Sequence, residues 1–313
     1  MIESTVVIGA GLSGLLVARQ RLSHGEKVLV VEKSRGLGGR MATKRIDEIV
    51  LDQGAQFFTA RSPAFQAIVD EWVEAGVAAR WPGSNHRFVG QPSMTGIAKH
   101  LAIGLNVKRE AKITAVRRIG GNWEVDVEEQ PTITAKRLVM TAPVPQSLSL
   151  LAAGGVQLPN ADAESLTQLV FHRCLSLLIL LDGPSAVPVE GVTASNGPLR
   201  WVADNGKKGV GAKSPGAITV HASPDFSATH YMDDDAQVAK LLLPFVRQWF
   251  GGSKELSVVL HRWKFSEPVT QYSHPCLWLP ELGLGMAGDA FGGPKMEGAA
   301  LSGLALAEVL AQA

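Results

Sequence analysis

The chain has 313 residues, a length that predicts about two domains at roughly 150 residues per domain. Hydrophobic residues make up 46% of the chain and charged residues 19%, which excludes an intrinsically disordered protein. Thirty Lys and Arg against 29 Asp and Glu leave a net charge of +1, so we expect no general attraction to nucleic acid or to an anionic membrane surface.

The first 31 residues follow the pattern of a strand, a helix and a second strand. Residues 5–8 and 27–31 are mostly β-branched and apolar, and the glycine-rich turn between them leads into apolar residues at helical spacing, including Leu15 and Leu16. Strand, helix and strand within about 30 residues form a βαβ unit, whose two strands are parallel. The chain therefore opens as an α/β fold.

Helices and strands are predicted along the rest of the chain as well. Apolar periodicity and chain-breaking residues predict helices at residues 63–80, 96–101, 234–250 and 297–311, and strands at 106–118, 123–127, 137–140, 175–181 and 217–221, with Gly/Pro-rich loops at 183–216. Asp233 or Asp234 is expected to cap the helix at 234–250, and Pro244 to kink it. We interpret the three aspartates at 233–235 as helix capping and not as a metal site.

These elements predict two domains that alternate along the chain. A discontinuous nucleotide-binding domain is expected at residues 1–60, 92–143 and 265–313, because apolar strands and glycine turns occur in all three segments. Residues 61–91 and 144–264 are expected to form an inserted α+β substrate domain built on a mixed sheet. The fold class is therefore α/β with an α+β insertion.

The two cysteines and the apolar runs bear on the compartment. Cys174 and Cys276 are far apart and not in a CxxC pattern, so neither a disulfide framework nor a zinc site is predicted. No apolar run approaches the roughly 18 residues that span a bilayer, and no basic stretch precedes the first one. We expect a cytoplasmic protein without bound metal that is neither secreted nor inserted in a membrane.

Gly9, Gly11 and Gly14 form a GxGxxG motif directly after the first strand and at the start of the first helix. Such glycines permit a tight turn, let a pyrophosphate approach the backbone, and let the helix pack close to its strand. Glu32 ends the second strand, 18 residues after Gly14, where an acidic side chain accepts both hydroxyls of an adenosine ribose. Strand, helix and acid in this order predict dinucleotide binding.

A second GxGxxG at residues 283–288 is interpreted differently. It is followed by Asp289 and then by Gly292, Gly293 and Pro294, so no helix is expected to begin there and receive a phosphate. We interpret it as a strand that runs into a sharp turn and presents Asp289.

Two further glycine-containing segments follow Glu32. Residues 35–41 combine adjacent glycines with Arg40, a guanidinium suited to phosphate, although a solvated loop is the alternative. Residues 51–58 place small residues before two phenylalanines, a pattern suited to lining a flat ring. Both segments are candidates for cofactor contact.

Five motifs in order resemble FAD-dependent oxidoreductases of the flavin amine oxidase superfamily, and within it most resemble the renalase branch. They are Gly9 to Gly14 with Glu32, Gly38-Gly39-Arg40-Met41, Asp52-Gln53-Gly54-Ala55-Gln56, Gly288-Asp289, and Met296-Glu297-Gly298-Ala299 with Ser302-Gly303. The resemblance covers both ends of the chain and only loosely residues 144–260. It implies a Rossmann-like FAD-binding domain of the glutathione-reductase and amine-oxidase type.

The resemblance also implies which residues hold FAD. Glu32 would bind the adenosine ribose, Arg40 and Gly11 to Ser13 the pyrophosphate, and Asp289 the ribityl chain, while the helix opened by Glu297 would point at the flavin pyrimidine edge. A helix N-terminus there stabilises the negative charge of reduced flavin. Lys112 matches the place where the family gives main-chain bonds to adenine, although residues 111–113 could simply form an edge strand. The full cofactor set is Gly9, Gly11, Leu12, Ser13, Gly14, Glu32, Lys33, Gly39, Arg40, Met41, Gly54, Ala55, Gln56, Lys112, Gly288, Asp289, Glu297, Gly298 and Ala299.

Two departures from amine oxidases concern the substrate. Lys295 stands where those enzymes often have a tyrosine of an aromatic cage, and a cation beside the ring would oppose a protonated amine. Residues 171–174 stand where they often carry a lysine, with Arg173 as its possible replacement. The substrate-pocket candidates are Gln56, His172, Arg173, Trp201, Arg262 and Lys295, although His172 and Trp201 could equally serve packing, and Arg262 could pair with an acid at a strand end.

Renalase-like enzymes oxidise isomeric dihydronicotinamide dinucleotides, 2- or 6-dihydro-NAD(P), to NAD(P)+ by hydride transfer to flavin N5, and O2 reoxidises the flavin to give hydrogen peroxide. The resemblance implies this reaction, which requires no acid or base, and no Ser/His/Asp or paired-carboxylate set is found in the sequence. The alternatives are oxidation of an amine and a non-catalytic, flavin-binding redox sensor. No cysteine lies beside the motifs, so noncovalent FAD is predicted, with no catalytic side chain assigned.

Overall fold

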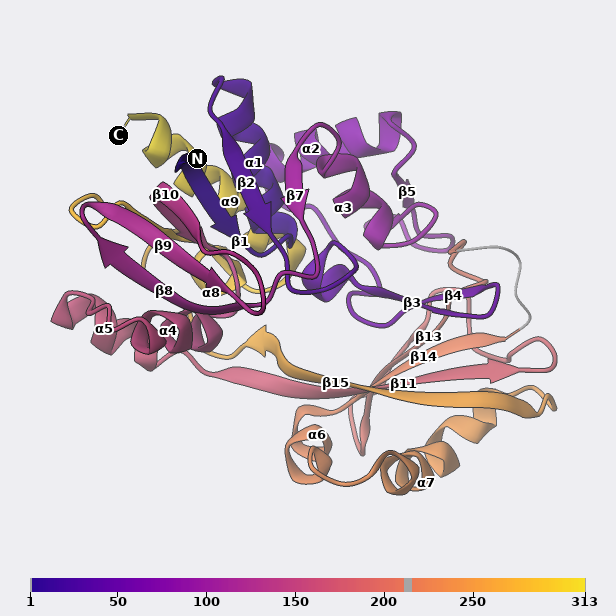
Figure 1. Cartoon of the computed structure of the whole chain (residues 1–313). Coiled ribbons are helices and arrows are strands. Elements are labelled where there is room, and N and C mark those ends of the chain that lie inside the picture. The colour runs from indigo at the N-terminus through magenta and orange to yellow at the C-terminus, as the bar shows by residue number, and fades with distance from the viewer. Residues whose placement is uncertain (1, 211–215, 313) are drawn as a thin grey trace. The chain divides into compact units, whose positions relative to one another are not determined.

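The computed structural model describes residues 2–210 and 216–312 (Figure 1). Contacts between residues divide the chain into two compact units. Unit 1 consists of Met1–Gly39, Ala98–Val170 and Pro268–Ala313, and unit 2 of Arg40–Ile97 and Phe171–Glu267. Each unit draws on segments that are far apart in the sequence, so both are completed only by long-range contacts.

Unit 1 is built on an eight-stranded mixed sheet with strand order β16-β17-β10-β1-β2-β7, to which β9 and β8 are added from β10. The pairs β17-β10, β10-β1, β1-β2 and β2-β7 are parallel, whereas β16-β17, β10-β9 and β9-β8 are antiparallel. The strands are β1 (Ile2–Ile8), β2 (Val28–Val31), β7 (Asn106–Lys108), β8 (Ile113–Ile119), β9 (Asn122–Val127), β10 (Ile133–Met140), β16 (Leu277–Leu279) and β17 (Leu284–Met286).

The centre of this sheet is buried because its strands are continuously apolar. All four residues of β2 are buried, and so are the last four of β1, as expected for parallel strands covered on both faces. Helix α1 (Leu12–Ser23) follows β1 and packs against α9 (Lys295–Gln312). A Cβ at Gly303 of α9 would lie 2.7 Å from the carbonyl oxygen of Ser13, so glycine permits the close approach of these two helices.

Shorter helices complete unit 1. Helix α4 (Val144–Ala153) packs against β8 and is followed by α5 (Asn160–Thr167), and α8 (Asp289–Gly292) is a single turn that packs against α9. The prediction that no helix begins after Gly288 is therefore wrong, because α8 starts at Asp289 before Gly293 ends it. The last helix begins at Lys295, two residues earlier than predicted.

Unit 2 contains a five-stranded sheet with strand order β12-β13-β14-β11-β15. Its strands are β11 (Phe171–Leu181), β12 (Val192–Thr193), β13 (Leu199–Asp204), β14 (Ala217–Ala222) and β15 (Glu255–Pro268). The pairs β12-β13, β13-β14 and β14-β11 are antiparallel. Unit 2 also contains the helices α2 (Pro63–Glu74), α6 (Pro224–His230) and α7 (Asp235–Val246), the 3-10 turns η1 (Gly39–Met41) and η2 (Arg247–Trp249), and the hairpins β3 (Thr43–Ile46) with β4 (Ile49–Asp52) and β5 (Ala78–Arg80) with β6 (Phe88–Gly90). Helix α3 (Thr95–Leu101) begins in unit 2, and its residues from Ala98 onward belong to unit 1.

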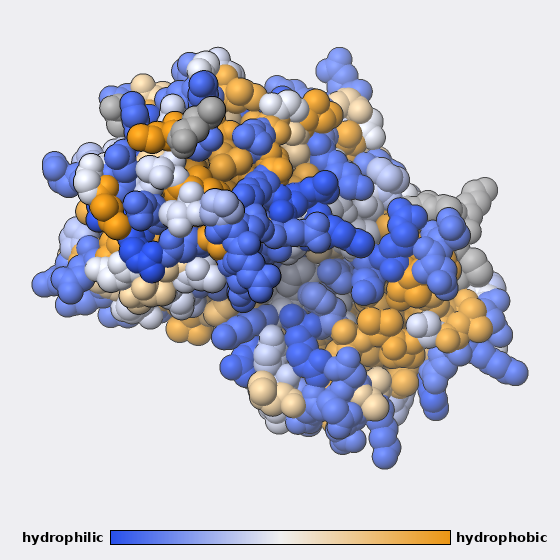
Figure 2. All heavy atoms as spheres, in the orientation of Figure 1, coloured by the Kyte–Doolittle hydropathy of each residue, from blue (hydrophilic) through white to orange (hydrophobic). Residues whose placement is uncertain are grey.

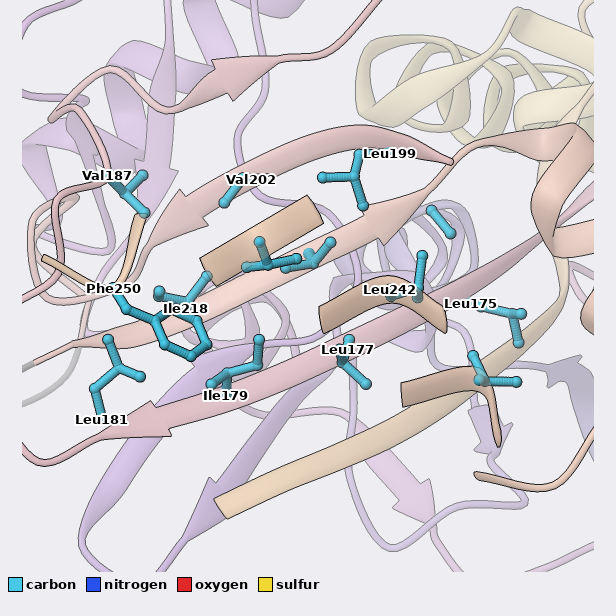
Figure 3. Close-up of a cluster of buried hydrophobic side chains, with 14 residues drawn as sticks. Leu175, Leu177, Ile179, Leu181, Val187, Leu199, Val202, Ile218, Leu242 and Phe250 are labelled. Atoms are coloured by element: carbon cyan, nitrogen blue, oxygen red, sulfur yellow. The ribbon is translucent and has the colours of Figure 1, made fainter. Parts of the chain in front are cut away.

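Both faces of this sheet are covered, and alternation along β11 assigns residues to each face. Leu177, Ile179 and Leu181 belong to a core that includes Leu242 of α7 (Figure 3). Leu178 and Leu180, with the opposite parity, pack with Leu51 of β4. We call the first surface the helix face and the second the hairpin face.

Several predicted elements of unit 2 differ from the structure. Residues 199–204, predicted as loop, form β13, because hydrogen bonds to β14 hold a segment whose flanking glycines and prolines resemble loop sequence. The helix predicted at 63–80 ends at Glu74, and residues 78–80 pair with β6 instead. Asp234 caps α7 as predicted, its side chain accepting a hydrogen bond from the Gln237 amide, and after Val246 the chain continues as η2.

The division into units also differs from the predicted domain boundaries. Residues 40–60 and 92–97 belong to unit 2, because β4 packs against the unit 2 sheet through Leu51, and the Met94 amide donates to the Asp52 carboxylate. Residues 144–170 belong to unit 1 since α4 packs on β8.

The surface of unit 2 is not uniformly polar. In the view of Figure 2, apolar side chains gather on the surface of this unit. The large hydrophobic side chains exposed on it include Phe245 of α7 and Leu256 of the edge strand β15. In the part of the chain that the structure describes, no helix is both long and apolar enough to cross a membrane.

Candidate functional site

The turn after β1 has the geometry that its glycines predict. Gly9 has a φ of +105°, which L-residues rarely adopt, and a Cβ on Gly14 would lie 2.1 Å from the Gly9 carbonyl oxygen. Gly11 differs, because its φ of −79° and ψ of 179° suit any residue and a Cβ there would meet nothing within 4 Å. Two glycines are thus required by the fold, whereas the third borders open space at the N-terminus of α1.

Glu32 is fixed beside this turn. It lies at the end of β2 with 6% of its surface exposed, and its carboxylate accepts hydrogen bonds from the amides of Ala10 at 2.9 Å and Ser34 at 2.8 Å. A carboxylate has about four acceptor positions, so two remain after these bonds. The Glu32 carboxylate is therefore oriented with capacity to accept the two hydroxyls of a ribose.

Two other predicted segments lie close to these residues. The Gly38 amide donates to the carbonyl of Ala10, and a Cβ on Gly39 would lie 3.5 Å from the Gly11 Cα. The Ala111 amide donates to the carbonyl of Glu32, so the segment before β8 runs beside the acid. Lys112 itself pairs with Glu128 at 2.6 Å on the surface, and Lys33 is exposed.

The C-terminal motifs join the same unit through α1 and α9. The Ser13 hydroxyl donates to the carbonyl of Ala299 at 2.5 Å, linking residues 286 positions apart, and Leu12 beside it is buried. The Gly288 amide donates to the Ser302 hydroxyl at 2.9 Å, and Asp289 is buried at the start of α8. Unit 1 therefore brings the N-terminal and C-terminal motifs together, with Glu297, Gly298 and Ala299 in the first turns of α9.

The residues of unit 1 fit a bound dinucleotide. Space at Gly11 is open, α1 begins there without a side-chain cap, and the carboxylate of Glu32 stands beside the turn. Backbone amides at an uncapped helix N-terminus attract phosphate charge, and the acid suits a ribose.

Unit 2 holds the other predicted cofactor residues in one compact arrangement. The Ala55 amide donates to the carbonyl of Arg40 at 2.9 Å, and the Gln53 amide donates to the carbonyl of Ala42 at 3.1 Å. A Cβ on Gly54 would lie 2.0 Å from the Arg40 carbonyl oxygen, so only glycine permits this approach. Met41 is buried and Arg40 donates to the carbonyl of Ser266.

Side chains on the hairpin face of the sheet bind the same segment from its other side. The carbonyl oxygen of Gln53 accepts hydrogen bonds from Ser176 of β11, His221 of β14 and Trp263 of β15 at distances of 3.0, 3.3 and 3.1 Å. Residues 52–56, which we call the strut segment, are therefore held between the turn at 40–42 and the sheet.

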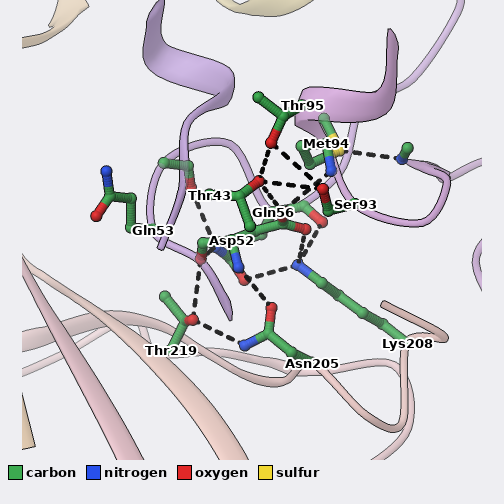
Figure 4. A network of polar contacts seen from close by, with 12 residues as sticks. Thr43, Asp52, Gln53, Gln56, Ser93, Met94, Thr95, Asn205, Lys208 and Thr219 are labelled. Carbon is green, nitrogen blue, oxygen red and sulfur yellow. Dashed lines mark hydrogen bonds and ion pairs between the residues drawn. The ribbon is translucent and has the colours of Figure 1, made fainter. Parts of the chain in front are cut away.

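A buried lysine that the sequence did not indicate completes this arrangement (Figure 4). Lys208 follows β13 and is fully buried, with its Nζ atom 3.0 Å from Asp52 Oδ2, 3.1 Å from Gln56 O and 3.0 Å from Gln56 Oε1. Burial lowers the pKa of Lys208, while the Asp52 carboxylate acts in the opposite direction. Lys208 follows another lysine in a glycine-rich turn, so no periodicity or motif could have identified it.

Two of the predicted pocket residues lie on the helix face of the unit 2 sheet. On β11 and β15, Arg173 and Arg262 lie on the helix face: Arg173 stacks on Tyr231 at 4.6 Å, and Arg262 pairs with Asp235 and donates to the carbonyls of Tyr231 and Asp233. Arg262 thus has the alternative role, pairing with an acid, that its sequence context allowed. Both arginines support α6 and α7 and do not lie on the hairpin face.

The other candidates have separate surroundings. Trp201 is 7% exposed and packs with Phe57 and Trp81, and its indole N–H has no hydrogen-bond partner among the described residues. His172 is partly buried with its carbonyl accepting from Ser266. The Gln56 amide donates to the carbonyls of Asp52 and Gly54 and accepts from Lys208, so it supports the strut segment. Lys295 is exposed in unit 1.

His221 is expected to make stability depend on pH. Burial lowers its pKa from 6.5 to about 4, although its hydrogen bond to Gln53 acts in the opposite direction. The unfolded chain then binds a proton between these values while the folded chain does not, so the contribution of His221 to stability is present above pH 6.5 and is lost as the pH falls toward 4. We expect a loss of about 2 kcal/mol from about pH 7 to about pH 5.

Urea unfolding of the wild type and of His221→Gln at both pH values measures this loss. The glutamine side chain can keep a donor for Gln53 but does not titrate, so the pH dependence of this variant should be smaller. An equal loss of stability in the two proteins would contradict the assignment.

A surface cavity of about 600 Å³ in unit 2 is lined by residues 194–200 and 223–226, and none of the predicted pocket residues lines it. Among the described residues, no group of three or more His, Cys, Asp or Glu is placed to hold a metal ion.

The fold and the unit 1 site define a Rossmann-like dinucleotide-binding protein. The family model of the NAD(P)-binding Rossmann-like domain matches residues 7–72, and that of the flavin containing amine oxidoreductase matches residues 82–311. The chain belongs to the flavin containing amine oxidoreductase family. It is an FAD-dependent oxidoreductase with FAD as cofactor, and the predicted fold class is confirmed.

Individual relatives share a low sequence identity with this chain or match only a short part of it. Renalase from Mus musculus is 22% identical over 295 residues, which cover 86% of each chain. Coproporphyrinogen III oxidase from Propionibacterium freudenreichii subsp. freudenreichii is 38% identical over 66 residues, 21% of this chain, and the match spans only 12% of that protein. Among solved structures, cyclohexylamine oxidase from Brevibacterium oxydans IH-35A shares the fold, with a TM-score of 0.71 at 12% identity covering 100% of this chain and 99% of that one.

Proposed function

We propose that this protein oxidises isomeric dihydronicotinamide dinucleotides, 2- or 6-dihydro-NAD(P), to NAD(P)+ with hydride transfer to flavin N5 and formation of hydrogen peroxide from O2. The observation that carries this proposal is the similarity to renalase over 86% of both chains. Bound FAD supplies the hydride acceptor, so the residues of the chain have to bind, orient and exclude water.

The titratable groups on the hairpin face support a donor that needs no base. Burial lowers the pKa values of His221 and His261, which makes both imidazoles weak proton acceptors. Burial also raises the pKa of Cys174 to about 12, so this thiol stays protonated. A dihydropyridine releases hydride without losing a proton from nitrogen, and it therefore requires no charged group here.

The cofactor residues are proposed to divide by unit. In unit 1, Glu32 binds the adenosine ribose, the turn at Gly11 binds the pyrophosphate, and Asp289 binds the ribityl chain. In unit 2, Arg40 and residues 54–56 contact FAD. The single observation that supports both assignments is that each set is held by hydrogen bonds within its own unit.

Rapid mixing of the oxidised enzyme with each substrate, followed by the visible absorbance of flavin, tests the reaction. We expect 2- or 6-dihydro-NAD(P) to bleach the flavin rapidly under anaerobic conditions, and ordinary NADH and a panel of primary and secondary amines to do so far more slowly. Bleaching by an amine alone would favour the alternative, an amine oxidase, which the family match supports. Reduction by none of them would indicate a non-catalytic sensor.

FAD is expected to be bound noncovalently. A covalent thioether needs a reactive thiolate, but burial raises the pKa of both Cys174 and Cys276. Acid precipitation of the purified enzyme should release the yellow colour into the supernatant. A pellet that stays yellow after washing would contradict this prediction.

A further inference from the structure

The strut segment has little freedom to move within unit 2. Its amides at Gln53, Gly54 and Ala55 donate to the carbonyls of Ala42 and Arg40, while its carbonyls at Asp52 and Gln53 accept from side chains of the sheet. A shift of this segment would therefore move the turn at 40–42 as well. Whatever fixes residues 52–56 also fixes Arg40.

Lys208 binds this segment through three polar contacts. Its Nζ atom donates hydrogen bonds to the two oxygens of Gln56, at 3.1 and 3.0 Å, and forms an ion pair with Asp52 Oδ2 at 3.0 Å. The face of the Trp81 ring lies beside the same ammonium group, with Nζ 5.8 Å from the ring centroid. The geometry matches a charged lysine that binds the first and last residues of the strut segment at once.

Asp52 connects the lysine to the rest of unit 2. Its other carboxylate oxygen accepts from the Thr43 hydroxyl and the Met94 amide, both at 3.0 Å, and its amide donates to Asn205 Oδ1. Asn205 in turn donates to Thr219 of β14, whose hydroxyl donates to the Asp52 carbonyl (Figure 4). The carboxylate is fully buried, so removing Lys208 alone would leave a buried charge without its ion pair.

Gln56 depends on Lys208 for its orientation. Its Nε2 atom donates to the carbonyls of Asp52 and Gly54, and its Oε1 atom accepts from Lys208. Without the ammonium, the Gln56 carbonyl and Oε1 would both lose a charged donor in a buried site, which costs more than an exposed hydrogen bond. The strut segment would then shift or loosen.

We propose that Lys208 is a positioning residue for the cofactor: through Asp52 and Gln56 it fixes the strut segment and the turn at Arg40 that bonds to it. This inference rests on the proposed contact of Arg40 and residues 54–56 with FAD. Lys208 acts through these residues and not on the reacting atoms. The buried ion pair sets where the cofactor-contacting backbone of unit 2 lies.

The test compares Lys208→Met with Lys207→Met in holoenzyme. Lys207 is the neighbouring residue of the same turn, but its ammonium donates to the carbonyls of Ser185 and Val187 and not to the strut segment. The rate of FAD release on dilution and the visible circular dichroism of bound flavin are measured. We expect Lys208→Met to release FAD about tenfold faster or more with an altered spectrum, because a buried carboxylate loses its partner, and Lys207→Met to stay within about twofold of the wild type.

Val246→Ala is the control for the effect of a loss of stability alone. Val246 lies in the core on the helix face, so this variant should lower the melting temperature without changing FAD release or the flavin spectrum. If Lys208→Met fails to fold, the double variant Asp52→Asn with Lys208→Met removes both charges and is measured in the same way. Either Lys208 variant, folded and with wild-type FAD release and spectrum, would overturn the proposal.

The result of the FAD-release test can be distinguished from the result of the test of the proposed function. Faster FAD release from Lys208→Met supports the positioning role even if the wild type is not reduced by a dihydronicotinamide. Conversely, a wild type that oxidises 2- or 6-dihydro-NAD(P), together with unchanged FAD release in Lys208→Met, overturns the positioning role and leaves the reaction intact.

Discussion

Replacing Gly11 by Val is expected to weaken FAD binding by about a hundredfold or more, equivalent to roughly 3 kcal/mol. The backbone at Gly11 has dihedral angles that Val adopts readily, and the space around its missing side chain is open. The fold therefore tolerates the substitution, at a cost of about 1 kcal/mol or less for a changed helix N-cap. In the binding mode that we propose, the valine side chain would displace the pyrophosphate of FAD.

Titration of apoprotein with FAD and thermal unfolding of apoprotein together measure this effect. Gly14→Ala in the same turn is the control, because its Cβ would lie 2.1 Å from the Gly9 carbonyl oxygen and 2.7 Å from the Thr141 hydroxyl. That variant should lose stability with or without FAD. Gly11→Val protein that binds FAD as tightly as the wild type would show that the turn does not contact the cofactor.

Replacing Gly298 by Ala is expected to destabilise unit 1 by about 3 kcal/mol or more, because overpacking against backbone is not relieved by a side-chain rotation. A Cβ there would lie 1.8 Å from the carbonyl oxygen of Gly293 and 2.8 Å from that of Gly292. The start of α9 would have to move away from α8. FAD binding should weaken as well, since Asp289, which we propose to bind the ribityl chain, lies at the start of α8.

Chemical unfolding of the Gly298→Ala apoprotein tests the stability. Ala305→Gly on the same helix is the comparison, since a partly buried alanine there should lose only about 1 kcal/mol of helix propensity. A free energy of unfolding for Gly298→Ala within that smaller range would contradict the steric argument.

The nucleotide-binding motif of unit 1 was predictable because its residues lie close together in the sequence. Gly9 to Gly14 and Glu32 follow from a strand, a turn and a helix in register, and the structure places the Glu32 carboxylate against the Ala10 amide as that register requires. The contact between α1 and α9 was not predicted, because no property of residues 9–14 indicates that Ala299 will accept a hydrogen bond from Ser13. The family resemblance implied only that motifs at both ends of the chain hold FAD.

The substrate-pocket residues were less predictable, because the strand pairing must be known before a residue can be assigned to one face of the sheet. Arg173 and Arg262 were reasonable candidates by charge, but the alternation of β11 and β15 directs both to the helix face. Reading that alternation requires knowing that Leu177 packs toward α7 and Leu178 toward β4, which depends on tertiary contacts. The role of Lys208 also depends on tertiary contacts and could not be predicted, because its partners Asp52 and Gln56 lie more than 150 positions earlier in the sequence.

The contact between α1 and α9 has a consequence for the order in which the protein can be assembled during synthesis. Strand β11 to strand β15 complete the unit 2 sheet by Pro268, whereas the β10 strand of unit 1 still lacks its neighbour β17 and α1 lacks α9 at that point. Distant contacts of this kind form slowly, and a half-built parallel sheet exposes an unpaired edge while the ribosome is still translating. The nucleotide-binding half therefore begins first and finishes last, so its nascent form is the one with the greater need of protection from aggregation.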